Sequence, residues 1–299
     1  MTYENFKLEI MKELHRIDAK HRYCFIATKN QKEVLMCLDS KCKGRDALAI
    51  TALYEESDKS ISMAQETARL FASSVRYSEF REHPNQSYEK LKDIICCRLI
   101  VANEDNKKLY KRAYTIPYLN FEIIFYLNFY GMEQQYHGIY TITKDTVNVW
   151  GISPNNLLDT AKANTMRLEM PMVIPFSVLA DELAEETGIP ELKNISDSLH
   201  TDGACYMVTN EHKNYGTTAL LFPEVFECIA RQNGHDLYLL ALSPHEVVAE
   251  PAGGQLKELQ YMTKLLCQDS DNDTYSRCVY LYHRGSGQVS ICLSDNLRS

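Results

Sequence analysis

The 299-residue sequence lacks long apolar runs, glycine-rich phosphate loops and large basic clusters. No stretch approaches the roughly 20 apolar residues of a membrane-spanning helix, so we expect no membrane partner. Neither G-x-x-x-x-G-K-[ST] nor G-x-G-x-x-G occurs, which argues against a nucleotide site of those kinds. The formal net charge is −8, and the densest basic run, Lys107-Lys108 with Lys111-Arg112, fits the solvated face of a helix. Such a chain does not suit a nucleic-acid backbone, so we expect no nucleic-acid partner.

Metal-ligand sets are also missing at the spacings that metals need. His245-Glu246 lacks the second histidine of an H-E-x-x-H motif, because Ala249 stands in its place. The run Asp269–Asp273 begins like a calcium loop, but Thr274 follows where that loop needs a glycine. We therefore expect neither a metal nor another cofactor.

The N-terminus and the cysteines together indicate a reducing compartment. Residues Met1–Phe6 open an amphipathic helix and lack the charged-then-apolar pattern of a signal peptide. The ten cysteines are scattered through apolar runs, such as Cys96-Cys97, where a thiol behaves as a small hydrophobic side chain. We predict a soluble cytoplasmic protein whose core needs no disulfide bonds.

Hydrophobic periodicity predicts an α+β fold with mixed, mainly antiparallel sheets and packed helices. The main predicted helices are 60–75, 105–113, 153–168, 176–187 and 223–232, and the main predicted strands are 23–28, 34–38, 47–53, 121–130, 205–209, 236–242, 278–283 and 288–293. The polar stretch Arg76–Gln86 is predicted to be a loop, which gives a smaller N-terminal lobe at 1–85 and a larger α+β domain at 86–299. The apolar run Ile94–Val101 fits either a strand or a buried helix.

Two segments, 142–164 and 208–233, show a similar order of residues. Each is interpreted as a strand, a T-[KN]-[DE] turn, a second strand and a helix that a proline begins. The second strands would be Thr146–Trp150 and Thr217–Phe222. An old duplication would give two similar halves with this strand-turn-strand-helix order. Alternatively, unrelated units look alike because turns and caps use few residue types.

Several short segments carry a family resemblance in their order and spacing. They are Arg98–Val101, Ile142-Thr143, Trp150–Ser153, Val208–Asn210, Ala219–Pro223 and Ser243–Val247. From about residue 50 to the C-terminus, the chain resembles the bacterial domain-of-unknown-function family 5688 of anaerobic Gram-positive gut bacteria. The resemblance implies a bacterial cytoplasmic protein with an α+β pattern. It implies no activity, cofactor or catalytic residue.

The loop Ser243-Pro244-His245-Glu246 follows a strand that is predicted to be central, and ligand sites often gather beyond the carboxyl ends of strands. Ser243 and His245 could supply the nucleophile and base of a hydrolase. Alternatively, Ser243 ties down the turn and Glu246 pairs with a neighbour, since residues two apart in a turn seldom point at each other.

Arg98, Asn164 and Asn210 complete the candidate ligand-binding residues. A buried Arg98 would need a partner, either in a structural ion pair or in an anion site. Asn164 lies near the apolar stripe of its helix, where it could bridge buried backbone or contact a ligand. Asn210 lies in the turn of the second repeated segment. The leading hypothesis is a non-catalytic binding or regulatory module with a protein or small-molecule partner, and the alternative is a hydrolase with its site at Ser243–Glu246.

Overall fold

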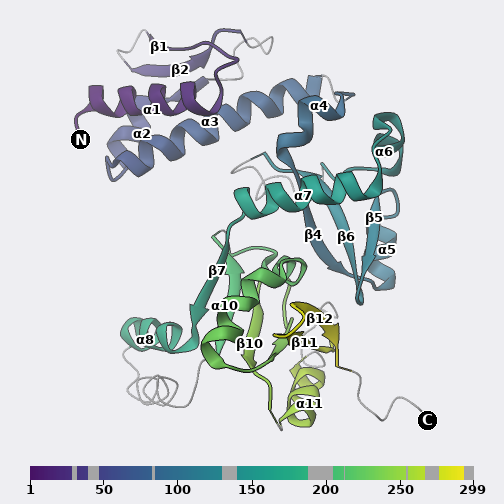
Figure 1. Cartoon of the computed structure of the whole chain (residues 1–299). Helices are drawn as coiled ribbons and strands as arrows, with labels where there is room; N and C mark the ends of the chain where they lie inside the picture. The colour runs from purple at the N-terminus through teal and green to yellow at the C-terminus, as the bar shows by residue number, and fades with distance from the viewer. Residues whose placement is uncertain are drawn as a thin grey trace. The chain divides into compact units, whose positions relative to one another are not determined.

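The computed structural model describes residues 1–28, 32–39, 47–82, 85–129, 140–187, 205–211, 213–253, 255–266 and 276–292, and its fold is α+β (Figure 1). The helices are α1 (Tyr3–Ile17), α2 (Ile50–Glu56), α3 (Ile61–Glu82), α4 (Tyr88–Leu91), α5 (Glu104–Leu109), α6 (Lys144–Trp150), α7 (Pro154–Leu168), α8 (Phe176–Thr187), α10 (Pro223–Asn233) and α11 (Leu256–Leu266), with the 3-10 helices η1 (Lys92–Ile94) and η2 (Gly216–Leu221). The strands are β1 (Tyr23–Ala27), β2 (Glu33–Cys37), β3 (Ala47–Ala49), β4 (Ile95–Val101), β5 (Thr115–Tyr118), β6 (Phe121–Leu127), β7 (Pro171–Pro175), β8 (Tyr206–Asn210), β9 (Leu237–Leu240), β10 (Val247–Pro251), β11 (Val279–His283) and β12 (Gln288–Ile291).

The chain divides into two compact units. Unit 1 comprises Met1–Ile94 and Leu127–Tyr140, and unit 2 comprises Ile95–Tyr126 and Thr141–Ser299. That 1–85 and 86–299 are separate domains stays a prediction. Among the described residues, no helix combines the length and the apolar character that crossing a membrane requires.

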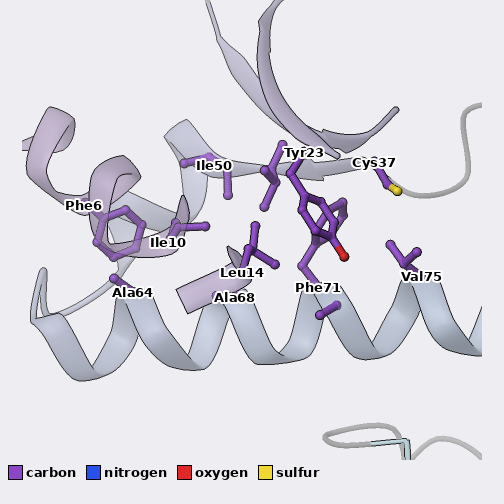
Figure 2. Close-up of a cluster of buried hydrophobic side chains, with 12 residues drawn as sticks. Phe6, Ile10, Leu14, Tyr23, Cys37, Ile50, Ala64, Ala68, Phe71 and Val75 are labelled. Carbon is purple, nitrogen blue, oxygen red and sulfur yellow. The ribbon is translucent and has the colours of Figure 1, made fainter. Parts of the chain in front are cut away.

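Unit 1 buries one face of α1 against α3, next to the antiparallel sheet β1-β2-β3. Phe6, Ile10 and Leu14 recur every four residues on α1, and all three side chains are fully buried. Helix α1 begins at a cap, because Thr2 Oγ1 accepts a hydrogen bond from the backbone N–H of Asn5. Figure 2 shows these side chains gathered above α3 with Phe71 and others, so the predicted amphipathic helix at the N-terminus is confirmed.

Helix α3 is longer than predicted and continues to Glu82, so the prediction of a loop at Arg76–Gln86 was wrong over most of its length. The polar residues of this stretch do not break a helix, and the proline comes only at position 84. Its last turns also bury an aromatic side chain, since Tyr77 is 7% exposed and its ring packs edge-on against Phe129 and Tyr140.

Unit 2 contains a three-stranded sheet of order β4-β6-β5 and a six-stranded sheet of order β12-β11-β9-β10-β8-β7. The ambiguous run Ile94–Val101 is a strand from Ile95, and α7 packs along it. Helix α7 has the predicted start, because Ser153 Oγ accepts from the N–H of Asn156 and Pro154 occupies the first helical position. Strand β9 lies between β10 and β11 with all of its side chains buried, as predicted for a central strand.

Both second strands of the proposed repeat were wrong. Thr146–Trp150 belongs to α6, because Thr143 Oγ1 caps the helix through the N–H of Thr146 and Gly151 ends it in the left-handed conformation, at φ +64°. Thr217–Leu221 belongs to the 3-10 helix η2, which Phe222 follows as the cap, and Thr217 donates a hydrogen bond to Ser243 O. Neither segment is therefore a strand-turn-strand-helix unit, and the prediction of two such halves was wrong.

Other boundaries also differ from the prediction. The third strand of unit 1 is shorter than predicted, because α2 begins at Ile50. The sequence reading missed β7, whose side chains are intermediate to exposed and show no clear alternation of burial. Residues 130–139 and 188–204 lie outside the described residues.

Candidate functional site

Arg98 points from the centre of β4 into the interior of unit 2 and is 6% exposed. Its guanidinium carbon lies 4.1 Å from the ring centroid of Tyr215 and 5.1 Å from that of Tyr126. A planar guanidinium stacks well on aromatic faces and gains from the ring quadrupole, most of all where water is excluded. The Tyr126 hydroxyl in turn donates to Oε1 of Glu169, a buried residue at the C-terminal end of α7. The buried Arg98 therefore contacts two tyrosine rings, a kind of partner that the sequence did not predict.

The backbone around Tyr215 is held in an uncommon conformation. Tyr215 has φ +54° in the left-handed region, which few non-glycine residues adopt. The next residue, Gly216, donates to the carbonyl oxygen of His245 at 3.1 Å, and a Cβ atom there would stand only 2.2 Å from that oxygen. Thr209 Oγ1 donates to the same oxygen at 2.7 Å. Strand β8, η2 and the loop at 243–246 therefore meet where only a glycine fits.

The polar side chains of the Ser243–Glu246 loop form hydrogen bonds within the loop and to the backbone of Tyr215. Ser243 Oγ donates to Oε1 of Glu246 and accepts from the backbone N–H of His245 at 3.0 Å. The exposed imidazole of His245 accepts at Nδ1 from the N–H of Tyr215 at 3.4 Å. The serine hydroxyl is thus bonded to a carboxylate, and the imidazole is bonded to backbone.

Asn210 and Asn164 both bridge backbone. Asn210 accepts at Oδ1 from the N–H of Asn214 and donates from Nδ2 to its carbonyl oxygen, which closes the turn before Tyr215. Asn164 donates to the carbonyl oxygen of Ile95 at 2.8 Å and accepts from Arg167 at 3.0 Å, which holds α7 to the start of β4.

We call the residues that surround Arg98 and Tyr215 the Arg98 junction. It comprises Arg98, Tyr126, Glu169, Thr209, Asn210, Tyr215, Gly216 and His245. The structure therefore brings Arg98, Asn210 and His245 together around Tyr215, while Asn164 bridges α7 and β4. The cavity lined by Glu169, Thr209, Asn210 and Tyr215 has a volume of ≈ 10 Å³. That is about the space of one water molecule, so this cavity has no room for a larger ligand.

A second hollow in unit 2, which we call the lysine pocket, is much larger, with a volume of ≈ 200 Å³. It lies between the end of β4, α5, β5, β6 and the start of α6. Its polar lining side chains include Asn106, Lys107, Tyr110, Lys111, Glu122 and Lys144. Lys107, Lys108, Lys111 and Arg112 are exposed, as predicted, but Lys107 and Lys111 also line this pocket.

Local hydrogen bonds explain how three separate lysines come to one pocket. Helix α5 starts at Asn103, whose Oδ1 accepts from the N–H of Asn106, and Asn106 Nδ2 donates to the carbonyl oxygen of Val101 at 3.0 Å. These bonds fix α5, and with it Lys107, against the end of β4. An antiparallel bridge joins Ala113 to Thr143, and the N–H of Lys144 donates to Arg112 O at 3.1 Å. The start of α6 therefore lies beside the turn after α5.

The charges of the lysine pocket are only partly neutralised. Lys107 Nζ lies 3.0 Å from Glu104 Oε1, but this pair is exposed and of the weak i,i+3 kind. Within the described ranges, Lys111 and Lys144 form no ion pair, and Oε2 of Glu122 is buried without a hydrogen-bond partner. The described lining of the pocket thus includes three lysines and one carboxylate.

The part of the chain that the structure describes holds no group of three or more His, Cys, Asp or Glu side chains suited to a metal ion. The calcium-like run 269–273 lies outside the described residues. The thiol of Cys97 is buried beside Thr165, and burial raises its pKa to about 12. That thiol is therefore protonated at neutral pH and is a poor nucleophile or metal ligand.

Comparison with known proteins identifies a family but no characterised relative. The model of a family of unknown function, DUF5688, matches residues 3–284. No curated protein and no solved structure matches the chain. Because the match spans nearly the whole sequence, the chain belongs to the DUF5688 family.

Proposed function

We propose that this DUF5688 protein is a non-catalytic binding or regulatory protein of the bacterial cytoplasm, and that it holds a small anionic molecule in the lysine pocket. The observation that carries the proposal is the convergence of three lysines on a pocket of ≈ 200 Å³. The chain as a whole has a net charge of −8, which repels anions at long range. A local group of ammonium charges is therefore the feature that would make one place on this surface attract an anion.

The size of the pocket supports a small molecule as the ligand. Pockets for drug-sized ligands measure about 300–1,000 Å³. A volume of ≈ 200 Å³ suits a metabolite with fewer atoms. Lysine is a compact charge with three donors and is a common ligand for phosphate and carboxylate groups.

The hydrogen bonds of the Ser243–Glu246 loop favour binding over the hydrolase alternative. A serine nucleophile needs a base within hydrogen-bond reach that takes its proton. Here the Ser243 hydroxyl donates to Glu246 and not to the imidazole of His245, which accepts from the backbone of Tyr215, so the predicted pair of serine nucleophile and histidine base is not formed. These contacts support a structural role for the loop, which is hydrogen-bonded to η2 and leads into the six-stranded sheet.

Isothermal titration of the full chain with inorganic phosphate at low ionic strength tests the proposal. We expect millimolar or tighter binding that Lys111→Ala with Lys144→Ala weakens about tenfold, because two charge-assisted contacts are lost. Lys108→Ala is the matched control, since Lys108 lies on α5 next to the pocket residue Lys107, pairs with Asp105 and does not line the pocket. An absence of phosphate binding, or an equal loss in the Lys108 variant, would refute the proposal.

A further inference from the structure

Among the described residues, Glu122 of β6 is the one carboxylate that lines the lysine pocket. Its neighbours Phe121 and Ile123 are buried on the other face of the strand, as the alternation of side chains requires. In the antiparallel register, Glu122 stands opposite Pro117 of β5, whose nitrogen carries no hydrogen to donate. One carboxylate oxygen, Oε2, is sealed from solvent and has no hydrogen-bond partner in the described part of the chain.

A buried carboxylate oxygen without a donor is costly, and such a group needs an explanation. The three pocket lysines do not supply the donor, because none of them lies within 4.0 Å of Glu122 among the described ion pairs. Glu122 as a whole is only half-buried, so a ligand with an ammonium group in the pocket would bring the opposite charge and up to three N–H donors to its carboxylate. The lysines would remain available for an anionic group on the same ligand.

We infer that the lysine pocket selects small molecules that carry both an ammonium group and a phosphate or carboxylate group, with Glu122 as the residue that recognises the ammonium group. This inference rests on the proposed function and adds the ligand class to it. Lys111 and Lys144 contact the anionic group, and Glu122 contacts the opposite end of the ligand. The pocket therefore discriminates by two charges of opposite sign.

The test compares two probes that differ in one group. O-phosphoethanolamine carries an ammonium group where 2-hydroxyethyl phosphate carries a hydroxyl. We expect the full chain to bind O-phosphoethanolamine about tenfold more tightly in isothermal titration. β-Alanine against propionate repeats the comparison for a carboxylate ligand, which distinguishes the two sources of the anionic group.

Two glutamate variants assign the preference to its residue. Glu122→Gln keeps the shape of the side chain but removes its charge, so the preference should vanish while phosphate binding stays equal or becomes tighter. Glu104→Gln, on the exposed face of α5, should keep the full preference. Glu122→Ala should also lose the preference for the ammonium probe, which would show that the loss in Glu122→Gln does not come from the introduced amide group.

The outcomes separate the inference from the proposed function. Equal binding of both probes, or a preference that survives in Glu122→Gln, overturns the inference and leaves anion binding in place. A failure of phosphate and of all four probes to bind overturns both.

Discussion

The Arg98 junction and the lysine pocket lie in the same unit, but they differ in whether their polar groups are hydrogen-bonded to the protein. In the junction, polar groups donate hydrogen bonds to nearby backbone carbonyl oxygens around a cavity of ≈ 10 Å³, as Thr209, Asn210 and Gly216 do. In the pocket, exposed ammonium groups and a buried carboxylate oxygen surround ≈ 200 Å³. Polar groups that are bonded to one another hold a fold together, whereas polar groups around an open volume are available to a ligand.

The largest effect should come from Gly216→Ala in the junction. The added Cβ would stand 2.2 Å from His245 O and 2.7 Å from Thr209 Cα, and both are backbone atoms that cannot rotate away. We expect a loss of about 3 kcal/mol in the free energy of unfolding, measured by urea denaturation. Gly285→Ala is the control, since its Cβ would meet nothing within 4 Å. A stable Gly216→Ala protein would show that the junction is not rigid.

Arg98→Met should have the next largest effect. Methionine keeps an apolar stem of similar length but gives up the stacking on Tyr126 and Tyr215. We expect a loss of about 2 kcal/mol in urea denaturation. Phosphate binding should be unchanged in the folded variant, because Arg98 does not line the lysine pocket. Weaker phosphate binding at unchanged stability would reverse the roles that we assign to the two regions.

A buried cluster in unit 1 extends the comparison, because it is bonded like the junction but can titrate. The side chains of His21 and Asp18 are each 4% exposed, and the two ring nitrogens of His21 lie 2.9 Å from Asp18 and 2.9 Å from Glu79. Burial lowers the pKa of His21, but the hydrogen bonds to both carboxylates outweigh it, so the pKa is raised. Arg76 and Lys20 are the cations that face the two carboxylates.

The raised pKa fixes the sign of the pH dependence. A group with a raised pKa in the folded state gives its full stabilisation below the unfolded value, about 6.5 for histidine, and loses it as pH rises through the folded value. We expect His21→Gln to cost about 1 kcal/mol more at pH 5.5 than at pH 9, by urea denaturation at each pH. A cost that does not change across this range would contradict a charged His21.

How much of the fold was predictable depended on whether the signal was local. Ser153-Pro154 predicted the start of α7 because a cap and a proline act within four residues. Thr143 is a similar local capping residue for α6, but Thr146–Trp150 was predicted to be a strand. The strand assignment of 217–222 failed for another reason. Residues 217–221 belong to η2, where Thr217 donates its hydroxyl to the carbonyl oxygen of Ser243, 26 residues further on, a contact that no local pattern predicts.

The candidate sites show the same limit. The sequence predicted that a buried Arg98 needs a partner, but the partner Tyr215 lies 117 residues away and owes its position to a left-handed backbone that is unusual for tyrosine. The lysine pocket depends on the bridge between Ala113 and Thr143, which places Lys144 beside the turn after α5. No sequence motif predicts the bridge, and none predicts that Oε2 of Glu122 is buried without a hydrogen-bond partner.

The smallest effect should also have the opposite sign. Glu122→Met removes a buried carboxylate oxygen that has no hydrogen-bond partner among the described residues, so no favourable contact is lost. We expect the free energy of unfolding to rise by about 0.5–1 kcal/mol, because water hydrates that oxygen in the unfolded chain, whereas the folded chain leaves it without a hydrogen-bond partner. Glu104→Met, at an exposed position on α5, should stay within about 0.5 kcal/mol of the unaltered protein. A loss of stability in Glu122→Met would mean that the carboxylate is part of the architecture, like the groups of the Arg98 junction. A gain in stability together with the loss of ammonium-dependent binding would mean that the fold tolerates Glu122 at a cost, because its carboxylate serves the ligand.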